Sequence, residues 1–178
     1  MSQKIIELLV TFLLTTICGG LLGFVFQRRH ARYQWLRSRW EKELDACQTI
    51  FEEVSRLLDR RLYRARQLAD SLASEQPDET KLLKYREVVT EWNDSINRIL
   101  ALLAISFGDE IRNALDYDVG AEVVAVGRLL EQEVRRQTNS GNDEMKIRIK
   151  SLAGKIYGFN LELLKHIQTK RDELIKFA

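Results

Sequence analysis

Hydrophobic residues follow two different patterns along this chain of 178 residues. Between residues 5 and 26 they are nearly continuous, IIELLVTFLLTTICGGLLGFVF, and Glu7 is the only formal charge. As a helix this stretch would be about 33 Å long, which matches the hydrocarbon core of a bilayer. Beyond it, apolar residues recur every three or four positions, the period of amphipathic helices that pack around a common core. The two patterns predict a membrane segment followed by a helical domain.

The first half of the periodic part predicts two long helices. No glycine or proline interrupts residues 27–73, so we expect the apolar stretch to continue directly into the first helix of the domain. The turn SEQPDET at 74–80 contains the only proline. A second helix should follow over 79–106, with Asp78 or Thr80 as its N-terminal cap.

The second half predicts two further helices. Gly108 and Gly120 mark breaks on either side of a short helix. A third helix should then run to the polar loop QTNSGND at 137–143, and a fourth from the end of this loop to the C-terminus.

These elements predict an all-α protein with two parts. Residues 1–27 form a single N-terminal transmembrane anchor, and residues 28–178 form a cytoplasmic, antiparallel bundle of about four main helices. The bundle follows from the apolar seams, because each helix must bury one face against the others.

The charges beside the apolar stretch predict its orientation. Lys4 alone precedes it, whereas five arginines follow it closely: Arg28, Arg29, Arg32, Arg37 and Arg39. Because positive residues stay on the cytoplasmic side, we expect a single-pass protein of the inner (cell) membrane with its N-terminus outside. A secretory signal would place its positive charge before a shorter apolar region. A buried core helix of a soluble protein is the remaining alternative.

One face of the apolar stretch carries small and polar residues at every fourth position. These residues are Glu7, Thr11, Thr15, Gly19 and Gly23. Such a ridge lets helix backbones approach closely in lipid, and its GxxxG pair is typical of self-associating membrane helices. Because a carboxylate facing lipid is costly, Glu7 favours a contact with a neighbouring helix or a pore. The alternative is ordinary membrane-helix composition, with Glu7 at the outer interface.

Motifs of enzymes and metal sites are missing from the sequence. His30 and His166 lack the neighbouring cysteine or histidine of a zinc site. There is no phosphate-binding loop, dinucleotide fingerprint or nucleophile elbow, and the carboxylates lack the ExxH pairs of a di-iron bundle. Cys18 and Cys47 do not form a disulfide framework, which fits a reducing compartment. We expect no enzymatic activity, no metal and no cofactor.

Two groups of basic residues stand out beyond the membrane segment. The first lies on the helix at 27–73 and comprises Arg56, Arg60, Arg61, Arg64 and Arg66. The second flanks the loop at 137–143, extends to Arg128 and Lys155, and gives a candidate ligand-binding set: Arg135, Arg136, Asn139, Asn142, Lys146, Arg148 and Lys150. Cations and side-chain amides together can hold phosphate, and Tyr157 and Phe159 lie nearby for base stacking. The alternative is surface charge paired with the many carboxylates.

A short anchor followed by a compact cytoplasmic domain without enzyme motifs resembles the layout of small membrane effectors of prokaryotic antiviral defence, such as the cyclic-oligoadenylate-activated membrane proteins of type III CRISPR systems. The resemblance assigns no site residues. It implies a homo-oligomer that senses a ligand, with a cyclic oligonucleotide as the candidate, and alters membrane integrity or opens a pore. A cyclic ligand would suit a cyclic oligomer, because each subunit offers one basic set about the axis.

The expected partners are therefore membrane lipid, further copies of the chain and a cyclic oligonucleotide, but no long nucleic acid. Two other functions fit the same residues. One is a membrane-anchored scaffold or adaptor that needs neither ligand nor pore. The other is a subunit of a larger membrane complex, in which the small-residue ridge packs against other chains.

Overall fold

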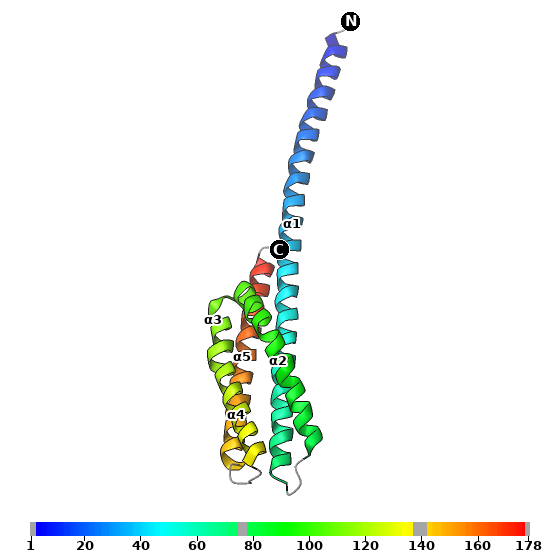
Figure 1. The fold of residues 1–178 in the computed structure, drawn as a ribbon. Helices are drawn as coiled ribbons and strands as arrows, with labels where there is room; N and C mark the ends of the chain where they lie inside the picture. The colour runs from blue at the N-terminus through cyan, green and yellow to red at the C-terminus, as the bar shows by residue number, and fades with distance from the viewer. Residues whose placement is uncertain (1–2, 75–77, 137–141, 177–178) are drawn as a thin grey trace. The chain divides into compact units, whose positions relative to one another are not determined.

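The structure, a computed structural model, describes residues 3–74, 78–136 and 142–176 (Figure 1). The helices are α1 (Gln3–Leu72), α2 (Glu79–Phe107), α3 (Asp109–Asn113), the π-helix η1 (Ala114–Val119), α4 (Gly120–Arg136) and α5 (Asn142–Lys176). These described ranges contain no β-strand. The predicted all-α class is confirmed.

The chain divides into two compact units. Met1–Lys42, with Ala178, form the first unit, and Glu43–Phe177 form the second. α1 contributes to both, since it runs for 70 residues. The predicted continuation of the apolar stretch into the first domain helix is thus confirmed. It follows from the lack of proline, because every backbone amide between residues 3 and 72 is free to bond within the helix.

Four helices of the second unit run alternately up and down (Figure 1). Side-chain bonds join them in the order α1, α2, α4, α5 and back to α1. These bonds are Arg60–Glu91 (2.8 Å), Arg86–Glu131 (3.3 Å), Lys155–Glu122 (3.2 Å) and Ser55–Asn160 (3.0 Å). The predicted antiparallel bundle is confirmed, with each helix packed between two neighbours.

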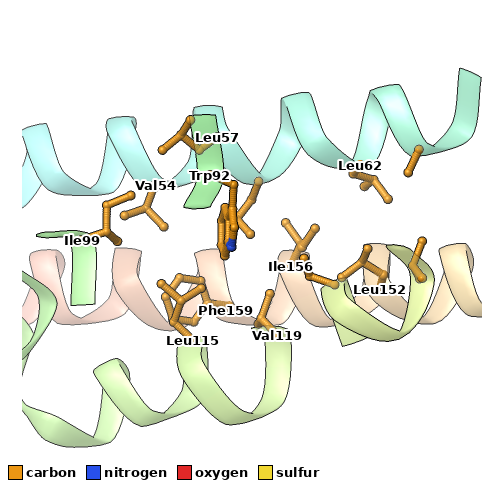
Figure 2. Close-up of a cluster of buried hydrophobic side chains, with 14 of the residues drawn as sticks. Val54, Leu57, Leu62, Trp92, Ile99, Leu115, Val119, Leu152, Ile156 and Phe159 are labelled. Atoms are coloured by element: carbon orange, nitrogen blue, oxygen red, sulfur yellow. The ribbon is translucent and has the colours of Figure 1, made fainter. Parts of the chain in front are cut away.

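The core of the bundle is built from the seams seen in the sequence. Along α5 every buried seam position is apolar: Met145, Ile149, Leu152, Ile156, Phe159, Leu163 and Ile167. Figure 2 shows Val54 and Leu57 of α1 and Trp92 of α2 within the same cluster as Ile156 and Phe159. Each fully buried large side chain contributes about 1.5–3 kcal/mol to folding. Burial of these seams therefore determines which face of each helix points inward.

The turn between α1 and α2 is capped as predicted. The Asp78 carboxylate accepts a hydrogen bond from the Thr80 backbone N–H at 2.9 Å, and the Asp78 N–H donates to the Ser71 hydroxyl at 2.7 Å. The hydrogen bonds from Thr80 hold the pKa of the Asp78 carboxyl below its ordinary value. Asp78 thus satisfies one of the free amides at the start of α2.

The predicted break at Gly108 is confirmed, and the one at Gly120 is wrong. Gly108 ends α2 with a φ of 90°, which favours glycine. Gly120 is helical, and its N–H donates to the carbonyl of Leu115, five residues earlier. A Cβ at residue 120 would lie 3.0 Å from that carbonyl oxygen. The glycine therefore accommodates the close backbone of a π-turn, and η1 joins α4 without a loop.

Candidate anion-binding groove

The N-terminal part of α1 exposes apolar side chains around its circumference. They include Leu8, Phe12, Leu14, Leu21, Phe24 and Phe26. Among the described residues, α1 is the one helix long and apolar enough to cross a membrane, and no part of its apolar window is buried. A continuous apolar surface of this kind needs lipid or another chain to cover it.

The threonine hydroxyls of the predicted ridge bond within the helix itself. Thr11 Oγ1 donates to the Glu7 carbonyl at 2.8 Å, and Thr15 Oγ1 donates to the Thr11 carbonyl at 2.8 Å. A Cβ added at Gly19 or Gly23 would meet no atom within 4 Å. The ridge therefore uses up its hydroxyl donors internally and is open along its glycines, which favours helix packing over a polar lining.

A groove of about 280 Å³ lies between α1 and α5 of the bundle. Its lining comprises Arg66, Ala69 and Asp70 from α1, and Lys146, Ile149 and Lys150 from α5. Both helices thus contribute residues at the spacing i, i+3, i+4, which places the three on one helix face. Ala69 and Ile149 are buried and form the floor, whereas the four charged side chains are exposed at the rim.

The side chains of Arg66, Lys146 and Lys150 have no ion pair or hydrogen bond with any described residue. The same holds for the side chain of Asp70. Elsewhere in the bundle, arginines bond across helices: Arg60 to Glu91, Arg86 to Glu131 and Arg98 to Glu53. With three positive side chains and one negative one, the groove has a formal charge of +2. It concentrates positive charge that the described residues do not neutralise.

The predicted ligand-binding residues separate onto different faces. Lys146 and Lys150 line the groove, whereas Arg148 lies 3.6 Å from the Glu122 carboxylate of α4. Lys155 bonds to the same carboxylate. Arg135 is exposed on α4. The side chains of Arg136 and Asn142, and all of Asn139, lie outside the described residues.

Arg66 is the groove residue that the sequence assigned to another group. It was counted with the basic residues of the first domain helix, 80 positions before Lys146. The sequence held one signal for this grouping, which is a spacing shared by the two helices. On each helix, one charged residue lies three positions before a buried residue and another lies one position after it. Spacing alone does not show which two helices are neighbours, so the pairing required the fold.

The aromatic residues expected beside the ligand do not lie in the groove. Phe159 is buried in the core, so its expected availability for base stacking is wrong. Its seam position, in step with Ile156 and Leu163, explains the burial. Tyr157 is exposed on α5 but does not belong to the groove lining. The groove therefore offers cations without an aromatic face.

Arg61 behaves unlike the other basic residues of α1. It is only 6% exposed, and its guanidinium lies 5.3 Å from the ring centroid of Trp92. Nη1 has no hydrogen-bond partner among the described atoms. Burial lowers the pKa of the Arg61 guanidinium and raises the pKa of the neighbouring Tyr85 phenol. Arg61 is thus part of the helix packing and not of an accessible site.

The described residues contain no cluster of three or more potential metal ligands. The two histidines contact other groups, since the ring of His166 meets Phe107 edge-on and the ring of His30 hydrogen-bonds to Gln34 at 2.9 Å. Comparisons of the chain with protein-family models, with curated proteins and with solved structures found no match.

Proposed function

We propose that this chain is a single-span membrane protein that presents a ligand-responsive helical bundle to the cytoplasm. The observation that carries the proposal is the apolar helix surface between residues 10 and 26, where every residue is exposed. The arginines after residue 27 support the cytoplasmic orientation of the bundle. In this proposal the apolar segment lies in the inner membrane.

Self-association through the membrane segment forms the second part of the proposal. The open ridge at Gly19 and Gly23 supports it, because two such helices can approach closely. Binding of a phosphate-bearing ligand, such as a cyclic oligonucleotide, to the bundle would then rearrange the associated helices and alter membrane integrity. The cations of the groove, which have no side-chain partner among the described residues, support the ligand-binding part.

A membrane-anchored adaptor is the second candidate function. Ile105 at the end of α2 is 83% exposed, although it belongs to the apolar run ILALLAIS. Tyr117 of η1 is exposed as well. Exposed large apolar residues on a folded bundle favour contact with another protein. In this case ligand and pore are not needed.

The membrane span and its orientation are tested in cells that express the full chain. We expect the protein to stay in the membrane fraction at alkaline pH. In a background with Cys18→Ser and Cys47→Ala, Ser2→Cys should react with a membrane-impermeant maleimide in intact cells. Ala178→Cys should react only after permeabilisation. Release of the protein at alkaline pH, or the reverse labelling pattern, would contradict the proposal.

Self-association is tested with Gly19→Leu combined with Gly23→Leu. These changes fill the open ridge and should lower the oligomer mass in mild detergent. Gly20→Leu is the matched control, because residue 20 lies about 100° around the helix from residue 19 and also has open space at its Cβ. An unchanged oligomer mass in the double variant would contradict self-association through Gly19 and Gly23.

Effector and adaptor differ in a vesicle experiment. The full chain is reconstituted into dye-loaded vesicles and titrated with cyclic oligoadenylates. Dye release that depends on the nucleotide supports the effector, and release should be weaker in the Gly19→Leu, Gly23→Leu variant. No release with any ring size contradicts the effector and leaves the adaptor, for which Ile105→Glu should abolish recruitment of the partner.

A further inference from the structure

We infer that the groove between α1 and α5 is a binding site for a compact phosphate group, held by Arg66, Lys146 and Lys150. The inference deepens the proposed function, on which its physiological role rests, by naming the chemistry that the bundle recognises. The ligand class is a phosphate-bearing molecule with a total charge of −2 or more. The site takes its phosphate oxygens and does not read an attached base.

The geometry of the groove suits an anion with several oxygens. Cations reach the rim from two helices, and the buried floor of Ala69 and Ile149 lies between them. The Arg66 guanidinium can donate two parallel hydrogen bonds to one phosphate, whereas the Lys146 and Lys150 ammonium groups act as point charges. A phosphate offers three terminal oxygens and a charge near −2, whereas a single carboxylate offers two oxygens and a charge of −1.

The net positive charge of the groove also favours a phosphate-bearing anion. Arg66, Lys146 and Lys150 have no described partner, while the cross-helix arginines of the bundle are paired with glutamates. An anion entering the groove therefore does not have to displace an existing ion pair. Asp70 is the one carboxylate among the described lining residues, and it opposes anion binding by its own charge. A ligand of charge −2 or more matches the formal charge of the groove.

Size and composition limit what else can bind. A volume of about 280 Å³ lies near the lower end of small-molecule sites, which span roughly 300–1,000 Å³. None of the described lining residues is an aromatic that could stack on a base. Phosphate chemistry of this size occurs both in soluble phosphoesters and in lipid headgroups, and the experiment must separate these sources.

The test uses the full chain in neutral detergent and inorganic pyrophosphate as the probe, with binding followed by calorimetry. Arg66→Ala with Lys150→Ala should weaken binding about tenfold or more, because each loses a charge-assisted contact. Arg56→Ala with Lys165→Ala is the matched control. These two exposed residues lie on the same two helices, outside the groove, and remove the same charge. The control should bind as the unmodified chain does.

Asp70→Asn gives a change of opposite sign. Removing this carboxylate should strengthen pyrophosphate binding a few-fold, because its repulsion is lost. Equal weakening by the groove pair and the control pair would overturn the site, since it would indicate binding by net charge alone. An absence of binding by the unmodified chain would overturn it as well.

A competition experiment identifies the source of the phosphate. Dihexanoyl phosphatidic acid, a soluble lipid that carries the same phosphomonoester as glycerol 3-phosphate, is added to the pyrophosphate complex. Displacement at concentrations below those of glycerol 3-phosphate supports a lipid headgroup, and the reverse order supports a soluble phosphoester. Both results require the groove. Because the probe binds the detergent-solubilised chain, failure here leaves the membrane span untouched, and alkaline extraction tests that span separately.

Discussion

Leucines of the two units illustrate how one helix serves two environments. Leu21, in the first unit, is 60% exposed, whereas Leu58, in the second, is 0% exposed. Both lie on α1 and have the same helix propensity. Around Leu21 the apolar residues occupy every face, and around Leu58 they occupy a single seam. The difference teaches that the angular spread of apolar residues, and not their number, indicates which surroundings a helix requires.

The two units also differ in the partners of their side-chain hydrogen bonds and ion pairs. In the first unit, Thr11 and Thr15 bond to carbonyls of their own helix. In the second, Ser55 and Arg60 bond to neighbouring helices. Thr49 of the second unit also bonds to a carbonyl of its own helix. Local bonds therefore occur in both units, and the second unit adds bonds between neighbouring helices.

The largest expected effect comes from truncating one leucine in each unit. Leu58→Ala should lower the free energy of unfolding of the bundle by about 2–5 kcal/mol, because a filled core position becomes a cavity. Leu21→Ala should change it by less than about 0.5 kcal/mol. Chemical denaturation followed by Trp92 fluorescence, in a background in which Trp35 and Trp40 are replaced by phenylalanine, measures both. Equal losses would show that the two parts of α1 share one core.

A charge in each exposed apolar position sharpens the comparison further. Leu14 and Leu83 are 58% and 60% exposed, respectively, but only Leu14 lies in the proposed span. Leu14→Arg should disfavour membrane insertion by about 2.5–3.5 kcal/mol, and Leu83→Arg should not affect it. The measurement is the membrane-bound fraction after alkaline extraction. If both variants stay in the membrane fraction, the proposed insertion of the apolar segment is contradicted.

Replacing the buried Arg61 should have a smaller effect on the stability of the bundle. Its contact with the Trp92 ring contributes about 2 kcal/mol when desolvated, and its unpartnered Nη1 costs about 1–3 kcal/mol. Because these terms nearly cancel, Arg61→Met should change the free energy of unfolding by no more than about 1 kcal/mol. A loss of several kcal/mol in the denaturation experiment would show that the hydrogen bond between the guanidinium and Tyr85 outweighs the cost of the unpartnered Nη1.

The sequence was sufficient to predict features that depend on residues close together in the chain. Seam positions such as Ile156 and Leu163 are buried, and Asp78 caps α2, because both features follow from local periodicity and turn chemistry. The chain direction of each helix followed from the short connections at 74–80 and 137–143.

Features that join distant segments could not be predicted in this way. Arg61 and Arg66 stand in one basic run, yet one is buried against α2 and the other lines a groove with α5. Their different environments depend on which helices lie beside α1. Gly120 was misassigned for a related reason, since glycine fits a loop and a π-turn equally well. Of the candidate site, only Lys146 and Lys150 were both predicted and brought together.

The smallest effect concerns the cap at the start of α2 and should appear only in the second unit. Because hydrogen bonds lower the pKa of Asp78 in the folded chain, the unfolded chain binds more protons near its ordinary pKa of 3.8. The stability contributed by Asp78 is therefore complete above this pH and is lost as the pH falls through the lower, folded pKa. Asp78→Ala should lower the Tm of the bundle at pH 7.

At acidic pH the difference between the Asp78→Ala variant and the unmodified chain should shrink, since a protonated carboxyl is a poorer acceptor for the Thr80 N–H. Asp78→Asn is the control, because asparagine caps helices well and does not titrate. Thermal unfolding of the three proteins between pH 7 and pH 3 measures the trend. A difference in Tm that stays constant over this range would mean that the cap does not act through its charge. The Asp78→Asn variant would then match the unmodified chain at every pH.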